Sequence, residues 1–513
     1  MAKSDWKKIA ASEDIRDGRP TGVELSEEES VLLMRRPEGL VALGDACPHV
    51  GCPLHFGRLD GDTITCACHN ARFDASSGRM ISPPALDDLP TYDVREEDGE
   101  VWLGPRHDPE PAKASGSDDR TVAIVGAGAA GAMTALQLRR EGFAGRVIMM
   151  TPEEHPPYDR TLLSKFYLGS EMQFEDIALR PDSAYEDLDI EVLTGKSATS
   201  VSPEERTVTL DDGSSLAADF VVLATGSRPR PLPVPGADLE GVHLLRVPKD
   251  AEHIRSAARS AQNVVVIGAS FIGTEVAAYL ADAGAPVTLV APEEVPFATL
   301  FGEEVGRKFA HMHRDAGVTL KLGNGVSRLT GSGSVEGVEL SDGSMIPADL
   351  VVVGIGVEPV VDYLEGSGLV ADGAVPVDSH LRTKADGFYA AGDIARIDDG
   401  EVSKRVEHWV VAQRHGQAIA RSIAGSLEPL GYAPFFWTRQ FETSFGYFGF
   451  APEYDEMRIK GSVADGDFLA GYFVEGRLAA VGTMGRSGEA IRYGQLLDEG
   501  RSITAEQFDS DTV

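Results

Sequence analysis

Hydrophobic runs predict two kinds of element along this chain. Short apolar runs near the N-terminus, such as 31–34 and 101–103, predict short β-strands. Between Arg106 and Asp119 the chain becomes polar and contains proline and glycine, which indicates a linker. About fourteen extended residues span roughly 45–50 Å. We therefore expect the N-terminal domain to be tethered to the rest of the chain rather than fixed against it.

Two later apolar runs, 121–125 and 264–267, each lead into a glycine-rich turn and then a helical pattern. The turn residues are Gly126, Gly128 and Gly131 in the first unit and Gly268, Ser270 and Gly273 in the second. Glycine permits a tight turn and the close approach of backbone to a pyrophosphate at the helix N-terminus, and serine is small enough to keep that approach. Two such units predict two α/β Rossmann-like domains that bind two dinucleotides. Two doubly wound domains without a ligand are the weaker alternative.

Charge and hydropathy limit the partners and the location. The chain of 513 residues has 81 acidic and 47 basic residues, a net charge of −34. Its length predicts about three or four domains, and its charge repels nucleic acid and anionic membranes. The longest apolar run, Val264 to Ala281, is interrupted by Gly268, Gly273 and Glu275, so it predicts strand, turn and helix rather than a membrane span. Because the start has no apolar signal region, we expect a cytoplasmic protein without a membrane span or a nucleic-acid partner.

All four cysteines lie between Cys47 and Cys68. Cys47 and His49 form a Cys-x-His arm, and Cys66 and His69 form a Cys-x-x-His arm. Two thiolates for one iron and two imidazoles for the other are the ligands of a Rieske 2Fe–2S cluster. Zinc also binds two cysteines and two histidines, but one of each in both arms favours the bridged cluster, and unliganded core residues are a weaker alternative still. No cysteine remains elsewhere for a redox-active disulfide, which excludes chemistry of the glutathione-reductase type.

The residues from Cys47 to Leu54 and from Cys66 to His69 resemble the two cluster-binding loops of Rieske ferredoxins. This resemblance implies that Cys47 and Cys66 bind one iron and His49 and His69 the other. Asn70 departs from it, because the family usually has glycine there. Cys52 and Cys68 match positions that form a disulfide between the loops of respiratory Rieske proteins, and two free buried thiols are the open alternative. Ala71 and Phe73 stand where high-potential clusters have a serine and a tyrosine, which implies a low potential.

Several later motifs resemble FAD-dependent ferredoxin reductases of the putidaredoxin-reductase type. They are the segments 157–160, 163–165, 224–229 and 390–393. Together with the N-terminal arms, they point to the Rieske-fused, apoptosis-inducing-factor-like branch. The resemblance implies a multidomain fold: an all-β Rieske domain at 1–106, a linker at 107–119, an FAD-binding domain at 120–243 and 373–430, an NAD(P)H-binding domain at 244–372, and an α+β C-terminal domain at 431–513.

The same resemblance implies roles for individual residues. Asp393 accepts from the ribityl chain of FAD, and Arg160 meets the pyrophosphate. Lys165 lies near the flavin N5 and pairs with Glu275, where charge is oriented for hydride arrival. The segment Glu407, His408 and Trp409 precedes a helix whose N-terminus faces the flavin pyrimidine, and Trp409 either stacks near the nicotinamide or packs in the core. We expect Lys165, Glu275 and Trp409 to be catalytic, and the further cofactor contacts to be Ala224, Thr225, Gly226, Arg228, Gly356 and Gly392.

The acidic residues expected to bind the two riboses do not stand at the usual positions. Glu153 or Glu154 must reach the adenosine ribose of FAD, since no acid stands at the expected place. Ala291 occupies the usual position of the NAD-selecting carboxylate, while the acids at 293 and 294 disfavour a 2′-phosphate, so we expect NADH to be preferred and leave NADPH open. The aromatic segments 436–437 and 445–448 are expected in the core or on a dimer surface rather than at a cofactor, which leaves a homodimer open.

These features together predict an oxidoreductase. We expect NAD(P)H to give hydride to FAD, FAD to pass single electrons to the Rieske cluster, and the cluster to reduce an external redox protein or small acceptor. The alternatives are a diaphorase-type oxidase that reduces oxygen or quinones directly, and an NADH-responsive redox sensor. An oxygenase catalytic subunit is excluded, because no further domain remains to hold a mononuclear iron.

Overall fold

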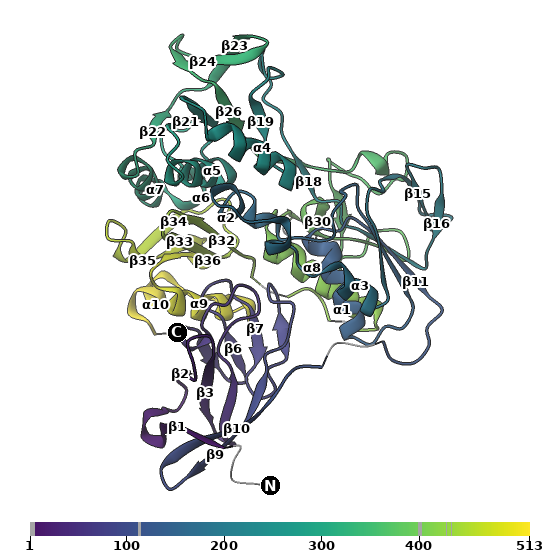
Figure 1. Ribbon diagram of the computed structural model, residues 1–513, viewed down its shortest axis with the longest axis vertical. Coiled ribbons are helices and arrows are strands. Elements are labelled where there is room, and N and C mark those ends of the chain that lie inside the picture. The colour runs from purple at the N-terminus through teal and green to yellow at the C-terminus, as the bar shows by residue number, and fades with distance from the viewer. Residues whose placement is uncertain (1–5, 111–113, 399–402, 427, 432, 513) are drawn as a thin grey trace.

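A computed structural model describes residues 6–110, 114–398, 403–426, 428–431 and 433–512 (Figure 1). The prediction about a signal region falls partly on residues 1–5, and part of the predicted linker falls on 111–113. Both stretches lie outside the described residues. Among the helices that the structure describes, none has both the length and the hydropathy that a membrane span requires.

The N-terminal domain consists of two antiparallel sheets. The larger has the order β1-β10-β9-β4-β3-β2 and the smaller the order β5-β6-β7-β8. The predicted runs 31–34 and 101–103 lie in β3 and β10. The bounds are β1 Lys7–Ala11, β2 Thr21–Glu24, β3 Ser30–Arg36, β4 Gly39–Gly44, β5 Arg58–Asp60, β6 Thr63–Thr65, β7 Arg72–Asp74, β8 Met80–Ser82, β9 Thr91–Glu97 and β10 Glu100–His107.

The first Rossmann-like unit is a parallel sheet of order β13-β12-β11-β17-β29. Its last strand, β29, comes from well beyond the second unit in sequence and pairs in parallel with β17. Helix α8 packs closely on α1, because a Cβ on Gly416 would lie only 2.2 Å from the carbonyl oxygen of Ala130. The bounds are β11 Thr121–Val125, α1 Ala129–Arg140, β12 Arg146–Met150, α3 Asp182–Asp187, β13 Ile190–Leu193, β17 Phe220–Leu223, β29 Phe388–Ala390 and α8 Trp409–Ile423.

The second unit repeats this plan with the sheet order β19-β26-β20-β21-β22. Its turn requires glycine, since Gly268 has φ +112° and a Cβ on Gly273 would lie 1.9 Å from the Gly268 carbonyl oxygen. The bounds are β19 Val242–Leu244, α4 Pro248–Ala258, β20 Val264–Ile267, α5 Phe271–Asp282, β21 Val287–Ala291, α6 Ala298–Phe301, α7 Glu303–Asp315, β22 Thr319–Leu322 and β26 Leu350–Val353.

Smaller sheets extend both units. They consist of β14 Ala198–Ser202, β15 Thr207–Leu210 and β16 Ser215–Ala217; β18 Ser227–Pro229 and β27 Val357–Pro359; β23 Val326–Ser332, β24 Ser334–Leu340 and β25 Met345–Pro347; and β28 Val375–Val377, β30 Ala395–Asp398 and β31 Ser403–Lys404. The short helix α2 Phe166–Gly169 follows the segment that carries Lys165.

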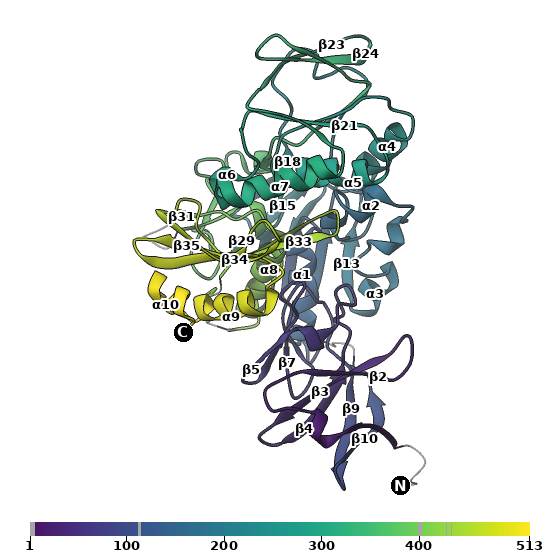
Figure 2. The same cartoon turned by 90° about the vertical axis from the view of Figure 1, so that its left-hand side faces the viewer.

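The C-terminal domain is a five-stranded antiparallel sheet of order β32-β33-β36-β35-β34, followed by two helices. It lies between the N-terminal domain and the second Rossmann-like unit, as both views show (Figures 1 and 2). These layers match the predicted multidomain fold class. The domain boundaries set out above stay predictions. The bounds are β32 Phe435–Gln440, β33 Thr443–Gly449, β34 Glu456–Ser462, β35 Asp467–Val474, β36 Arg477–Met484, α9 Ser487–Asp498 and α10 Ala505–Ser510.

The N-terminal domain is docked, and the expectation that it is only tethered is wrong in this structure. Asp87 forms an ion pair with Arg180 (2.6 Å), and Asp88 forms one with Arg140. On α8, the amide of Gln417 donates to the Ile81 carbonyl at 3.0 Å. Further contacts join Arg414 to Ser82 and Arg72 to Asp498. The length of a linker limits only its reach, whereas the complementary groups on the two surfaces determine where the domain rests.

Candidate metal centre and cofactor cavity

The two loops that carry the Cys/His arms have the same backbone design. In the first, the amide of Cys47 donates to the Cys52 carbonyl and the amide of Gly51 donates back to Cys47. In the second, the amide of Cys66 donates to the Ala71 carbonyl and the amide of Asn70 donates back to Cys66. Each loop is therefore a closed turn that fixes its cysteine at the base.

The repeated loop design explains why asparagine is tolerated at position 70, where glycine was expected. Gly51 and Asn70 occupy equivalent places and both have left-handed backbones, with φ +75° and +63°. Asparagine adopts this conformation more readily than most residues. The loop therefore keeps its shape although asparagine replaces the expected glycine, and Asn70 is buried beneath it.

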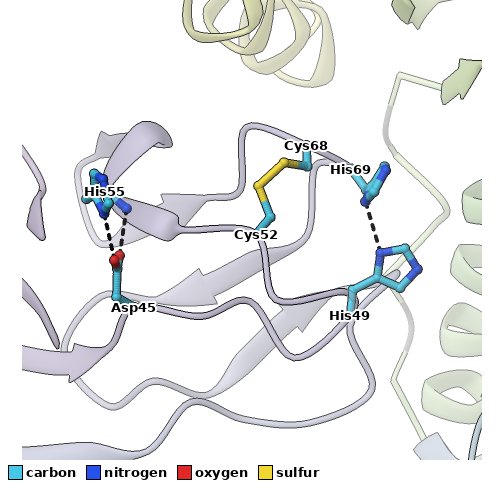
Figure 3. Close-up of a disulfide and its surroundings, with 6 residues drawn as sticks. All are labelled: Asp45, His49, Cys52, His55, Cys68 and His69. Atoms are coloured by element: carbon cyan, nitrogen blue, oxygen red, sulfur yellow. Dashed lines mark hydrogen bonds and ion pairs between the residues drawn. A yellow bond between two sulfur atoms is a disulfide. The ribbon is translucent and has the colours of Figure 1, made fainter. Parts of the chain in front are cut away.

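The four predicted ligands lie together at the tips and bases of these loops. Nδ1 of His49 is 3.0 Å from Nδ1 of His69, so both imidazoles turn the same nitrogen toward one point (Figure 3). Cys47 and Cys66 are buried and free. A hydrogen bond between the two thiols raises the pKa of Cys47 and lowers the pKa of Cys66 to about 7. Two adjacent sulfurs and two converging nitrogens fit the donor set of a Rieske cluster.

The other two cysteines are bonded to each other. Cys52 and Cys68 form a disulfide that joins the two loops, with their Cα atoms 6.4 Å apart (Figure 3). The sulfurs of Cys52, Cys66 and Cys68 lie within 4.8 Å of one another. Because the disulfide uses two of these sulfurs, only Cys66 remains among them as a thiolate donor.

The outer edges of both histidines face other domains. Nε2 of His49 lies 3.5 Å from Oδ2 of Asp159, which belongs to the first Rossmann-like unit. The ring of His69 packs against Trp437 of β32, with ring centroids 4.3 Å apart. Burial, followed by the charge of His49, lowers the pKa of His69 to about 3. The metal centre is therefore covered by two residues that are far from it in sequence.

A cavity of about 810 Å³ opens between the two Rossmann-like units. Both glycine-rich turns contribute to its wall, and so does Trp437, whose ring also packs against His69, a predicted ligand of the metal centre. Most of the predicted cofactor residues line it: Gly126, Gly128, Glu153, Arg160, Lys165, Ala224, Thr225, Gly226, Ser270, Glu275, Gly356, Gly392, Asp393, Glu407, His408 and Trp409.

Four predicted cofactor residues do not line the cavity. Gly131, Gly268 and Gly273 shape the two turns, since a Cβ on Gly131 would lie 1.9 Å from the Gly126 carbonyl oxygen. Arg228 instead pairs at the surface with Glu358 (2.7 Å) and with Asp362, so its contact with a cofactor stays a prediction. Its neighbour Ser227 faces inward instead, and side chains alternate along β18.

Two arginines lie at one end of the cavity, each beside a carboxylate. Arg160 donates to Glu153 at 2.6 Å, and Tyr158 donates to the other oxygen of that carboxylate at 2.7 Å. Of the two candidate ribose acids, Glu153 lines the cavity and Glu154 does not. Arg246 lies beside Arg160, and burial together with that neighbour lowers the pKa of Arg246 to about 10. Two partly exposed guanidinium groups fit a pyrophosphate, and Arg246 was not anticipated from the sequence.

The predicted lysine–glutamate pair forms in the interior. Nζ of Lys165 lies 2.8 Å from Oε2 of Glu275, and both side chains are buried. Ser164 donates to the same oxygen at 2.5 Å, while Thr438 donates to Oε1 at 2.7 Å. Each carboxylate oxygen thus has a donor, which offsets the cost of burying the charge. Thr438, from β32, was not anticipated.

Helix α8 begins at Trp409 with its N-terminus at the cavity, as expected from the segment 407–409. The positive end of the helix dipole therefore points into the site. His408 stacks on Phe436 with centroids 4.1 Å apart, and burial lowers its pKa to about 4, so it is neutral near pH 7. Phe436 lies in the aromatic core, as expected, but both Phe436 and Trp437 also line the cavity, and Trp437 contacts His69 as well.

Comparison with known proteins agrees with this arrangement. The chain matches the Rieske [2Fe-2S] domain over residues 5–93, pyridine nucleotide-disulphide oxidoreductases over 120–416, and the reductase C-terminal domain over 435–513. Apoptosis-inducing factor 3 from Homo sapiens is 34% identical, covering 96% of this chain and 83% of that protein. Rhodocoxin reductase from Rhodococcus erythropolis is 34% identical, covering 75% and 91%.

Solved structures give the same result. The ferredoxin reductase for the CYP199A2 system from Rhodopseudomonas palustris superposes with a TM-score of 0.73 at 34% identity, covering 76% of this chain and 97% of that one. The putidaredoxin reductase–putidaredoxin complex gives 0.72 at 32% identity, covering 76% and 95%. The chain therefore belongs to the pyridine nucleotide-disulphide oxidoreductases, as a Rieske-fused oxidoreductase of the ferredoxin reductase type that uses FAD, NAD(P)H and a 2Fe–2S cluster.

Proposed function

We propose that this oxidoreductase passes electrons from NADH through FAD to its own Rieske cluster, and from there to an external acceptor. The observation that carries the proposal is Trp437, which forms part of the cofactor cavity on one side and contacts the metal-centre ligand His69 on the other. When bound, FAD would accept a hydride and release single electrons, and a 2Fe–2S cluster would accept them one at a time. The cytoplasmic location and a homodimer stay predictions.

Different residues of the cavity would bind different parts of FAD. We propose that Arg160 and Arg246 hold the pyrophosphate of FAD, that Glu153 binds its adenosine ribose, and that Asp393 accepts from its ribityl chain. The buried pair of Lys165 and Glu275 would orient charge where the hydride arrives. The dipole of α8 would stabilise negative charge on the reduced ring.

The fused domain suggests how the acceptor is reached. One similar structure is a covalent complex of putidaredoxin reductase with putidaredoxin, so that reductase meets a separate redox protein. In this chain the Rieske domain packs against β32 beside the cavity. We propose that the Rieske domain replaces a separate first carrier, and that the external acceptor takes electrons from the cluster rather than from the flavin.

Steady-state turnover of His69→Ala tests this order. The variant should bind FAD and reduce a small artificial acceptor such as ferricyanide at an undiminished rate, because that acceptor reacts at the flavin. It should lose reduction of a redox-protein acceptor such as a ferredoxin or cytochrome. The proposal fails if the variant still reduces the protein acceptor at the wild-type rate.

A redox sensor is the second candidate function. It is favoured by the similarity to apoptosis-inducing factor 3, which extends over the Rieske domain as well as the reductase part. A sensor would hold its reduced state for a long time, whereas a reductase would turn over rapidly. Stopped-flow oxidation of the NADH-reduced protein by candidate acceptors separates the two.

A further inference from the structure

We propose that Asp159 is a positioning residue that holds the cluster ligand His49 and thereby fixes the Rieske domain in its electron-accepting position. The inference rests on the proposed function and names the contact that makes the transfer within one chain efficient. It goes beyond the flavin-binding motif in which Asp159 stands, because the side chain faces away from the cofactor cavity and toward the other domain.

The two oxygens of Asp159 have separate tasks. Oδ1 accepts from the backbone amide of Thr161 at 2.9 Å and from its hydroxyl at 2.7 Å, which caps a short helical turn. Oδ2 is left for Nε2 of His49, at 3.5 Å. The residue is only 7% exposed, so the carboxylate is enclosed at the domain boundary.

The imidazole of His49 is oriented to meet this carboxylate. Its Nδ1 converges with Nδ1 of His69 on the metal centre. A neutral imidazole that binds metal through Nδ1 carries its proton on Nε2, where it can only donate. Among the described residues, Nε2 of His49 is buried and has no hydrogen-bond partner at normal distance, and the Asp159 carboxylate is the acceptor beside it. A small closure of the gap completes a charge-assisted hydrogen bond.

The other polar contacts described above between the N-terminal domain and the rest of the chain do not involve a predicted cluster ligand. The pair Arg180–Asp87 is partly exposed, with Asp87 half open to solvent, and such pairs contribute little. They orient the domain broadly, whereas the Asp159 contact acts on a cluster ligand itself. Because the carboxylate adds negative charge beside the cluster, it must also favour the oxidised form and lower the midpoint potential.

The variant Asp159→Asn in the full-length holoprotein tests the proposal. Asparagine keeps the Oδ1 cap, but it removes the charge and turns an NH₂ group toward the N–H of His49. We expect the cluster midpoint potential to rise and the flavin-to-cluster transfer rate, measured after rapid reduction of the flavin, to fall at least tenfold. A higher potential alone would accelerate the transfer, so slower transfer reports lost positioning. The matched control Asp87→Asn removes an interdomain ion pair away from the ligands and should leave both quantities within twofold.

Each outcome decides the matter. An unchanged potential and rate in Asp159→Asn, or equal effects in Asp87→Asn, would overturn the proposal. If Asp159→Asn fails to load its cluster, Asp159→Ser restores a capping hydroxyl without the charge and should show the same two changes. Loss of the cluster in both variants would show that Asp159 is needed for folding instead, and would also overturn it. Failure of the proposed function would be seen separately, in the wild type. It would show as no electron transfer from NADH to the cluster, whatever the variants do.

Discussion

The disulfide between Cys52 and Cys68 should determine how firmly the cluster is held. The two cysteines are 16 positions apart, and the bond ties the first ligand loop to the second. Closing a loop of this length is worth about 3 kcal/mol. Since about 1.4 kcal/mol changes an equilibrium tenfold, opening of the loops should become roughly a hundredfold more favourable without the bond. The pairing of β5 with β6 inside this loop remains, so the figure is an upper value.

The assay is the rate at which the visible absorption of the cluster disappears in an iron chelator and mild urea. Cys52→Ser, Cys68→Ser and the double variant should all lose the cluster at the same faster rate, because each removes the same bond. Reduction of the wild type with dithiothreitol should reproduce that rate, and the variants should not respond to dithiothreitol.

Two results would refute this reasoning. Single variants that lose the cluster no faster than the wild type would show that the bond does not hold the loops. Mass spectrometry of alkylated, unreduced protein that finds both thiols free would show that the bond does not form.

Three further predictions follow from the sites. Purified protein should contain two irons and two acid-labile sulfides per chain, and His69→Cys or His69→Ala should lose the Rieske optical and EPR signals while retaining FAD; stoichiometric zinc without sulfide would contradict this. The specificity constant should be moderately higher for NADH than for NADPH. Ala291 ends β21, and the exposed acids Glu293 and Glu294 that follow it disfavour the 2′-phosphate of NADPH. Initial-rate kinetics with both coenzymes checks this. The cluster potential should lie near the low end of the Rieske range, around −150 mV, since the buried Ala71 and Phe73 offer no hydroxyl to sulfur. The double variant Ala71→Ser with Phe73→Tyr should have a higher potential in protein-film voltammetry. A wild-type potential well above zero would argue against the account.

The cluster arms and the glycine turns could be predicted because their chemistry depends on short spacing. Cys47 and His49 are close in sequence, as are Cys66 and His69, and local loop geometry brings each pair to the metal centre. Gly131 and Gly273 are each required by a close contact with a carbonyl oxygen five residues earlier, at Gly126 and Gly268.

Contacts between distant segments could not be predicted in this way. Asp159 meets His49, and Trp437 meets His69, only because three domains pack together. Thr438 reaches Glu275 because it points to the opposite side of β32 from Trp437, and no spacing rule links these positions. The same limit applies to Arg228, because a motif position does not say which side of a strand its side chain faces.

The most direct test of the account is anaerobic mixing of the full-length protein with NADH, followed by freeze-quench EPR and flavin absorption. We expect the flavin to be reduced first and the cluster signal to rise afterwards, with a first-order rate that does not change when the protein is diluted tenfold. Dilution independence is required if Trp437 and Asp159 hold the cluster beside the cavity of the same chain. A cluster that stays oxidised, or whose reduction slows in proportion to dilution, would contradict the account.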